Sequence, residues 1–108
     1  EKTLGENIAD LGGTLAAYDA FVALRESQGC FGDELTKQKK LFLESFANFW
    51  SEKLSPKMCL DMQKKDVHSN SIARVNGVVC NFPDWYSLYD VRSNNKLYLA
   101  PERRVSIW

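Results

Sequence analysis

Apolar side chains recur at helical spacing through the first quarter of the chain, and this pattern most constrains its fold. It predicts a helix from about Leu4 to Gln28, and Gly29 is a typical stop signal. A helix of that length with one apolar face needs another element to cover the face. The residues that carry the pattern are Leu4, Ile8, Leu11, Leu15, Tyr18 and Val22.

An aromatic stripe predicts a second helix, from about Thr36 to Lys53, whose apolar face packs into a core. The stripe consists of Phe42, Phe46, Phe49 and Trp50. Ser55-Pro56 then combines an N-cap with a first-turn proline, so we expect a third helix that starts there and ends near Lys65.

After Asp66 the pattern becomes irregular. Arg74-Val75 is expected to be extended, Asn76-Gly77 is a turn signal, and residues 78–80 suit a short strand or a buried loop. Pro83 is expected to open a short helix, and the apolar end at Ile107-Trp108 predicts a docked C-terminus. The predicted class is mainly α, with ordered loops and at most a short strand.

Composition limits the function more than the fold. The 108 residues suit one domain or part of one, and 44% of them are hydrophobic. Fourteen basic residues balance fourteen acidic ones, so no net field favours nucleic acid or an anionic membrane. No apolar run reaches the roughly 18 residues of a membrane span.

Three cysteines without a CxxC spacing predict free thiols, at least two of them buried. The chain starts at Glu1, not Met, which suggests a segment cut from something longer.

Glu6 and Asp10 are four residues apart and share one face of the first helix, where like charges cost roughly 0.2–0.5 kcal/mol. We expect a cation beside them, either a basic side chain or a metal. Thr3 and Glu6 also match a capping box, and spacing alone favours that cap. The cap leaves Asp10 unexplained. As a metal site, Glu6 would bind zinc, and Asp10 would accept the free ring N–H of a zinc-bound histidine.

Three further polar residues are candidates, although each alone suits an ordinary surface role. His68 is the single histidine, and it could donate to an oxyanion with Asp66 holding it in place. Arg74 could bind a carbonyl or carboxylate in bidentate fashion. Catalytic zinc usually takes three protein ligands, and this chain has neither enough histidines nor an HExxH motif to provide them.

Taken together, these segments resemble the neprilysin and endothelin-converting-enzyme family of zinc endopeptidases, and its bacterial endopeptidase O branch in particular. The matching segments are Gly5-Glu6-Asn7-Ile8-Ala9-Asp10 with Gly12-Gly13, Phe42 to Trp50, Asp66-Val67-His68-Ser69 with Arg74-Val75-Asn76-Gly77, Asn81-Phe82-Pro83 and Arg104 to Trp108.

The resemblance implies a role for each candidate residue. Glu6 matches the third zinc ligand, and Asp10 matches the carboxylate that orients a zinc-bound histidine. His68 matches the histidine that stabilises the oxyanion, with Asp66 as its supporting acid, and Arg74 matches the arginine that grips a substrate carbonyl. The chain would then be the C-terminal segment, residues 1–108, of a thermolysin-like catalytic domain. Its substrates would be oligopeptides.

Departures from the family pattern set further expectations. The HExxH helix, with two zinc-binding histidines and the water-activating glutamate, would lie upstream, so this segment alone should be inactive. Ser51 and Val105 stand where many animal members have cysteine, which favours a bacterial origin. The other partner would be the rest of the parent protein, and an isolated segment could self-associate. Family habit favours the cell envelope, periplasm or outside, with the cytoplasm as the alternative. A non-catalytic helical interaction module or an inactive homologue is the alternative function.

Overall fold

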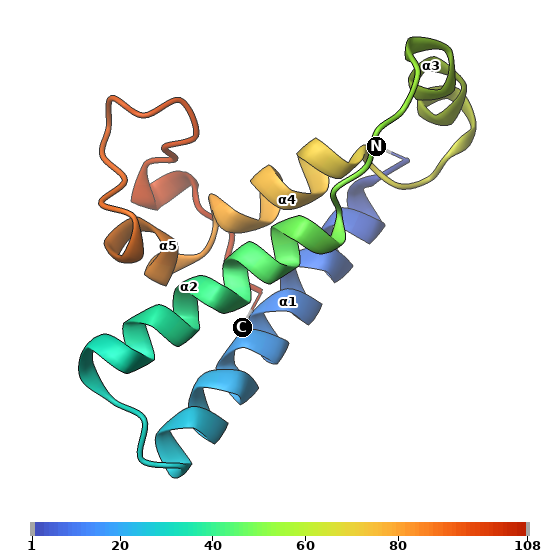
Figure 1. Cartoon of the computed structure of the whole chain (residues 1–108). Helices are drawn as coiled ribbons and strands as arrows, with labels where there is room; N and C mark the ends of the chain where they lie inside the picture. The colour runs from blue at the N-terminus through green and yellow to red at the C-terminus, as the bar shows by residue number, and fades with distance from the viewer. Residues whose placement is uncertain (1, 108) are drawn as a thin grey trace.

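The computed structural model describes residues 2–107, and within them every regular element is helical (Figure 1). This confirms the mainly α class. The elements are α1 (Leu4–Ser27), α2 (Gly32–Phe49), α3 (Pro56–Lys65), α4 (Ser71–Val79), α5 (Pro83–Leu88) and a short 3-10 helix (Pro101–Arg103). No helix among the described residues is long and apolar enough to span a membrane.

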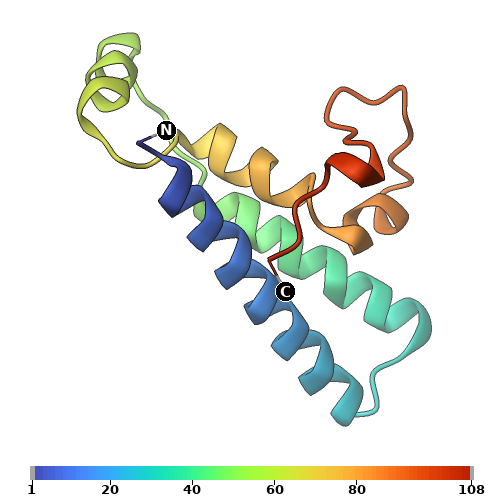
Figure 2. The same cartoon turned by 180° about the vertical axis from the view of Figure 1, so that it is seen from behind.

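Helices α1 and α2 form an antiparallel hairpin, and α4 packs on both of them (Figure 1). The turn between them uses Gly29 and Gly32, whose φ angles of 79° and 59° favour glycine over residues with a side chain. Helix α5 packs on α2, while α3 projects from one end beside the start of α1. The chain after the 3-10 helix, up to Ile107, returns along α1 (Figure 2).

The core lies where α1, α2, α4 and the start of α5 meet. Tyr18 is 4% exposed and packs edge-on against Phe42 and Phe82, with ring centroids 5.3 Å apart in both pairs. Phe82, just before α5, is 1% exposed. Ile107 packs against this cluster, which confirms docking for that residue, whereas Trp108 lies outside the described residues. The buried residues of the cluster are Leu11, Tyr18, Leu43, Val78 and Phe82.

The prediction for residues 74–80 was wrong, because this segment is the helix α4. The Asn70 side chain accepts a hydrogen bond from the backbone N–H of Ala73 and caps the helix. Val78 and Val79 are buried. Capping and burial therefore outweigh the low helix propensity of valine, asparagine and glycine that suggested a turn and a strand.

Other predictions need smaller adjustments. Helix α2 begins and ends about four residues earlier than expected, with Asp33 and Glu34 in its first turn, where negative charge favours a helix start. Helix α3 begins and ends as predicted, and the Ser55 hydroxyl accepts from the Met58 N–H. Helix α5 begins at Pro83 as expected. All three cysteines are free, but Cys30 is buried, Cys80 half-buried and Cys59 exposed, so burial of two was wrong.

Candidate active site

Glu6 lies in the first turns of α1 and faces the loop between α3 and α4. Its Oε2 is 3.2 Å from His68 Nε2, and the two side chains are 47% and 36% exposed. The Thr3 side chain makes no capping hydrogen bond. The capping-box interpretation was therefore wrong, because the Glu6 carboxylate lies beside His68, which is distant in the sequence but close in space.

His68 is held by Asp66 on the side of the ring away from Glu6. Asp66 Oδ1 accepts a hydrogen bond from the His68 backbone N–H at 2.9 Å and lies 2.8 Å from ring Nδ1. The backbone N–H, and then the ring contact, lower the pKa of the Asp66 carboxyl. The imidazole thus has one nitrogen on Asp66 and presents the other, Nε2, to Glu6.

Arg74, on α4, pairs with Asp10, on α1, in a bidentate geometry. Its Nε and Nη2 donate to the two carboxylate oxygens at 2.7 and 2.6 Å. The side chains are only 14% and 16% exposed. The guanidinium carbon also lies 3.9 Å from the centroid of the Trp50 ring. The hydrogen bonds to Asp10 raise the pKa of Arg74, so this cation is fixed in charge and in orientation.

These pairs show which basic side chains lie beside the two carboxylates. Arg74 neutralises Asp10, and the imidazole of His68 stands beside Glu6. A carboxylate can accept further hydrogen bonds beyond the two from Arg74. The predicted role of Asp10 toward a metal-bound histidine is compatible with this pairing and stays a prediction.

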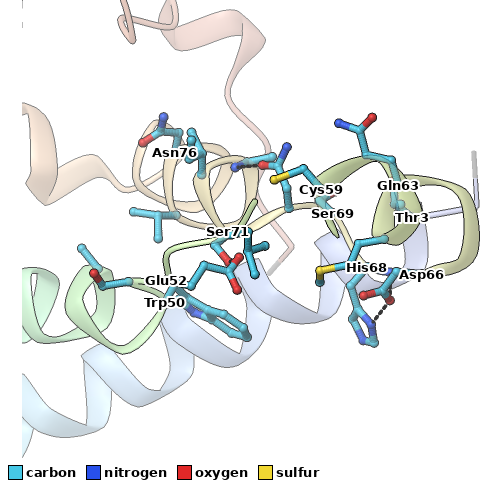
Figure 3. A pocket seen from close by; sticks show the side chains of 18 of the residues that line it. Thr3, Trp50, Glu52, Cys59, Gln63, Asp66, His68, Ser69, Ser71 and Asn76 are labelled. Atoms are coloured by element: carbon cyan, nitrogen blue, oxygen red, sulfur yellow. Dashed lines mark hydrogen bonds and ion pairs between the residues drawn. The ribbon is translucent and has the colours of Figure 1, made fainter. Parts of the chain in front are cut away.

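A hollow of about 790 Å³ lies beside the site, between the end of α2, α3 and the start of α4. Figure 3 shows His68 and Asp66 on one side of it and Trp50 with Glu52 on another. Glu6, Asp10 and Arg74 do not line it. The hollow therefore reaches the polar site through His68 and Asp66, whereas the Glu6, Asp10 and Arg74 side chains lie outside its lining.

Comparison with known proteins identifies the family. The family model described as peptidase family M13 matches residues 1–105. The chain belongs to peptidase family M13. It is 33% identical over 105 residues to a neutral endopeptidase of Lactococcus lactis subsp. lactis, covering 97% of this chain and 15% of that protein. It is 34% identical over 111 residues to the neprilysins of Mus musculus and Homo sapiens, covering 99% of this chain and 14% of each.

Membership in the M13 family thus rests on nearly the whole chain. The chain nevertheless spans only about 15% of the length of the curated relatives it matches. No solved structure gives a significant match. The zinc-peptidase resemblance seen in the motifs is confirmed at the level of the family.

Zinc is the metal that the family implies, and the described residues offer it a single donor here. No three His, Cys, Asp or Glu side chains within residues 2–107 are placed to hold a metal ion. Glu6 fits as one ligand, because a half-exposed carboxylate oxygen is a normal zinc donor. Residues outside this chain would have to complete the site.

Sequence reasoning missed three residues near the site. Trp50 was assigned to the core stripe, but it is only half-buried and lies against the Arg74 guanidinium. Asn7 and Ser69 stand in the matching motif segments but were given no role, although the Ser69 hydroxyl donates to Asn7 Oδ1 at 2.8 Å. Their positions in those segments, directly after Glu6 and His68, were the available signal.

Proposed function

We propose that this chain is the C-terminal segment of the catalytic domain of a zinc endopeptidase that cleaves internal bonds of oligopeptides. The longer protein is called the parent protein below. The observation that carries the proposal is the approach of Glu6 to His68, 3.2 Å between residues 62 positions apart. The carboxylate that binds zinc and the group that donates to the oxyanion must lie near the same scissile carbonyl. The Glu6 and His68 side chains lie close together, as this arrangement requires.

Glu6 would be one ligand of the zinc ion in the parent protein. Bound zinc would lower the pKa of a water molecule and polarise the scissile carbonyl. His68 Nε2 would donate a hydrogen bond to the oxyanion that forms on that carbonyl. Asp66 supports this role, since its contact with Nδ1 at 2.8 Å fixes the ring's orientation.

Arg74 would bind a backbone carbonyl of the peptide. Asp10 takes hydrogen bonds from Nε and Nη2, and no described residue accepts one from Nη1. The guanidinium is therefore held rigidly while part of its donor edge stays available. Binding through a preorganised arginine lowers the entropy lost when the substrate is positioned.

The rest of the parent protein is the second proposed partner. Large apolar side chains are exposed along α1, α2 and α3, and exposed apolar surface is what another part of a protein covers at an interface. Examples are Leu4, Ile8, Leu41, Phe49, Met58 and Leu60. We expect the parent to cover these faces and the isolated chain to lack activity or to self-associate. The alternative of a non-catalytic module used Glu6 as a helix cap, and that cap is not formed. A location in the cell envelope or outside the cell stays a prediction.

The experiment compares Glu6→Gln with the unmodified parent protein in cleavage of an internally quenched peptide. Gln keeps the size of the side chain but removes the charge that binds zinc, so we expect loss of bound zinc by elemental analysis and loss of activity. Glu26→Gln, at an exposed position near the other end of α1, is the matched control and should keep both. Full activity and zinc in Glu6→Gln would refute the ligand assignment.

A further inference from the structure

The loop that carries His68, residues 66–70, contacts α1 through polar side chains. Helix α3, which leads into it, has no buried residue, and Val67 is 51% exposed. Lys2 Nζ donates to the carbonyls of Gln63 and Lys64 at 2.8 and 3.3 Å. Ser69 Oγ donates to Asn7 Oδ1 at 2.8 Å. A few hydrogen bonds therefore determine where the loop lies relative to α1.

The bond between Ser69 and Asn7 lies next to the two groups that must converge. Asn7 follows Glu6 on α1, and Ser69 follows His68 on the loop. The hydrogen bond therefore joins the two backbone stretches whose side chains approach to 3.2 Å. Lys2 holds the end of α3 instead, through the carbonyls of Gln63 and Lys64, which precede the loop.

We propose that Asn7 and Ser69 are positioning residues, which set the distance between Glu6 and the oxyanion-stabilising edge of His68. This inference rests on the proposed function. Neither residue touches the reacting atoms. Their effect comes through the placement of His68, and a misplacement of about 1 Å can cost as much as 10²-fold in rate.

The exposure of Asn7 and Ser69 distinguishes a positioning role from a role in folding stability. Asn7 is exposed and Ser69 is half-exposed, so their hydrogen bond competes with water and adds little to folding. Its loss should consequently appear in the chemical step far more than in thermal unfolding.

The test uses Ser69→Ala, Asn7→Ala and the double variant in the parent protein. We expect about a 10-fold lower kcat in each, with KM within twofold, because the oxyanion contact is made only in the transition state. A phosphonate peptide, which imitates the tetrahedral intermediate, should bind about 10-fold more weakly, while a non-cleaved substrate analogue should bind unchanged. The double variant should be no worse than either single variant, since all three remove one bond.

Two variants serve as controls. Ser69→Thr keeps the hydroxyl and should restore kcat and phosphonate affinity. Ser87→Ala removes another exposed serine, whose hydroxyl donates to the Asp84 carbonyl within α5, and should leave both unchanged. Bound zinc and melting temperature should match the unmodified protein in every variant. If Ser69→Ala fails to fold, Asn7→Ala tests the same bond from a helix position where alanine is favourable.

The outcomes separate the two proposals. Unchanged kcat and phosphonate affinity in both single variants, or additive losses in the double variant, would overturn the positioning role while leaving the proposed function intact. Full activity of both Glu6→Gln and His68→Ala would instead reject the proposed function.

Discussion

The two ends of the helical hairpin are held together by different forces. At the end near Tyr18 and Phe82, helices α1, α2 and α5 meet in an aromatic core. At the end near Glu6 and Asp10, the contacts to α4 and its preceding loop are ion pairs and hydrogen bonds. The first end is dry and packed, whereas the second is partly open to solvent.

The difference indicates how stability and chemistry are divided. Burial of aromatic area stabilises a fold without directing any group at a ligand. Polar side chains that are partly exposed, such as Glu6 and His68, contribute little to stability but can be aimed at a substrate. Changes at the packed end should therefore alter unfolding, and changes at the polar end should alter catalysis.

The largest expected effect is on stability at the packed end. Phe82→Ala would remove a ring that is 1% exposed, and such a truncation costs about 3–5 kcal/mol in the free energy of unfolding. Urea denaturation followed by tryptophan fluorescence measures it. Phe49→Ala is the matched control, because that ring is 77% exposed and should cost much less. An equal loss of unfolding free energy in the two variants would show that Phe82 does not belong to the core.

The next effect is on catalysis at the polar end. His68→Ala in the parent protein should lower kcat by about 10²–10³-fold, the usual cost of losing an oxyanion donor. Its melting temperature should change little, because the side chain is 36% exposed. Steady-state kinetics and thermal unfolding of the same sample test both halves. An unfolding loss comparable to that of Phe82→Ala would contradict the division between the two ends.

The sequence predicts the features that depend on local signals and misses those that depend on contacts between distant residues. The helices α1 and α3 were predictable because periodicity and capping are local signals, as with Ser55. Helix α4 was not, because its stability comes from burial of Val78 and Val79 against distant residues. The candidate site residues were proposed from the spacing of Glu6 and Asp10 and from motif resemblance, and their roles stay predictions. The pairing of Asp10 with Arg74 could not be found that way, since it depends on how α4 crosses α1.

A smaller effect concerns an ion pair at the packed end. The Tyr18 hydroxyl donates to Asp84 Oδ2 at 2.7 Å, and Lys39 lies 3.0 Å from the same atom. Burial alone would raise the pKa of Asp84, but these two hydrogen bonds outweigh it and lower the pKa. Tyr18→Phe should cost about 1–2 kcal/mol near pH 7, at the low end for a bond to a charged group because Asp84 is 39% exposed.

The pH dependence of that loss has a definite sign. A lowered folded-state pKa stabilises the protein above the unfolded value of about 3.9, and the benefit disappears as pH falls through the folded value. The difference between Tyr18→Phe and the unmodified chain should hence shrink below about pH 4. Urea denaturation between pH 3 and pH 7 measures it. Tyr89→Phe, which loses a more exposed bond to Glu44, is the control with a smaller cost. A loss independent of pH would mean that Asp84 is not the partner that matters.

The smallest effect lies at the boundary between the two ends, where Trp50 supports the Arg74 guanidinium at 3.9 Å. A cation–π contact of this kind contributes about 0.5–2 kcal/mol, depending on exposure. Trp50→Leu should raise KM of the parent protein by about 3- to 10-fold, because Arg74 keeps its charge and its bond to Asp10 but loses the surface that fixes its plane. Phe31→Leu, on an exposed ring in the turn between α1 and α2, should leave KM unchanged. A fall in kcat with unchanged KM would place Trp50 with His68 in the chemical step instead of with Arg74 in substrate binding.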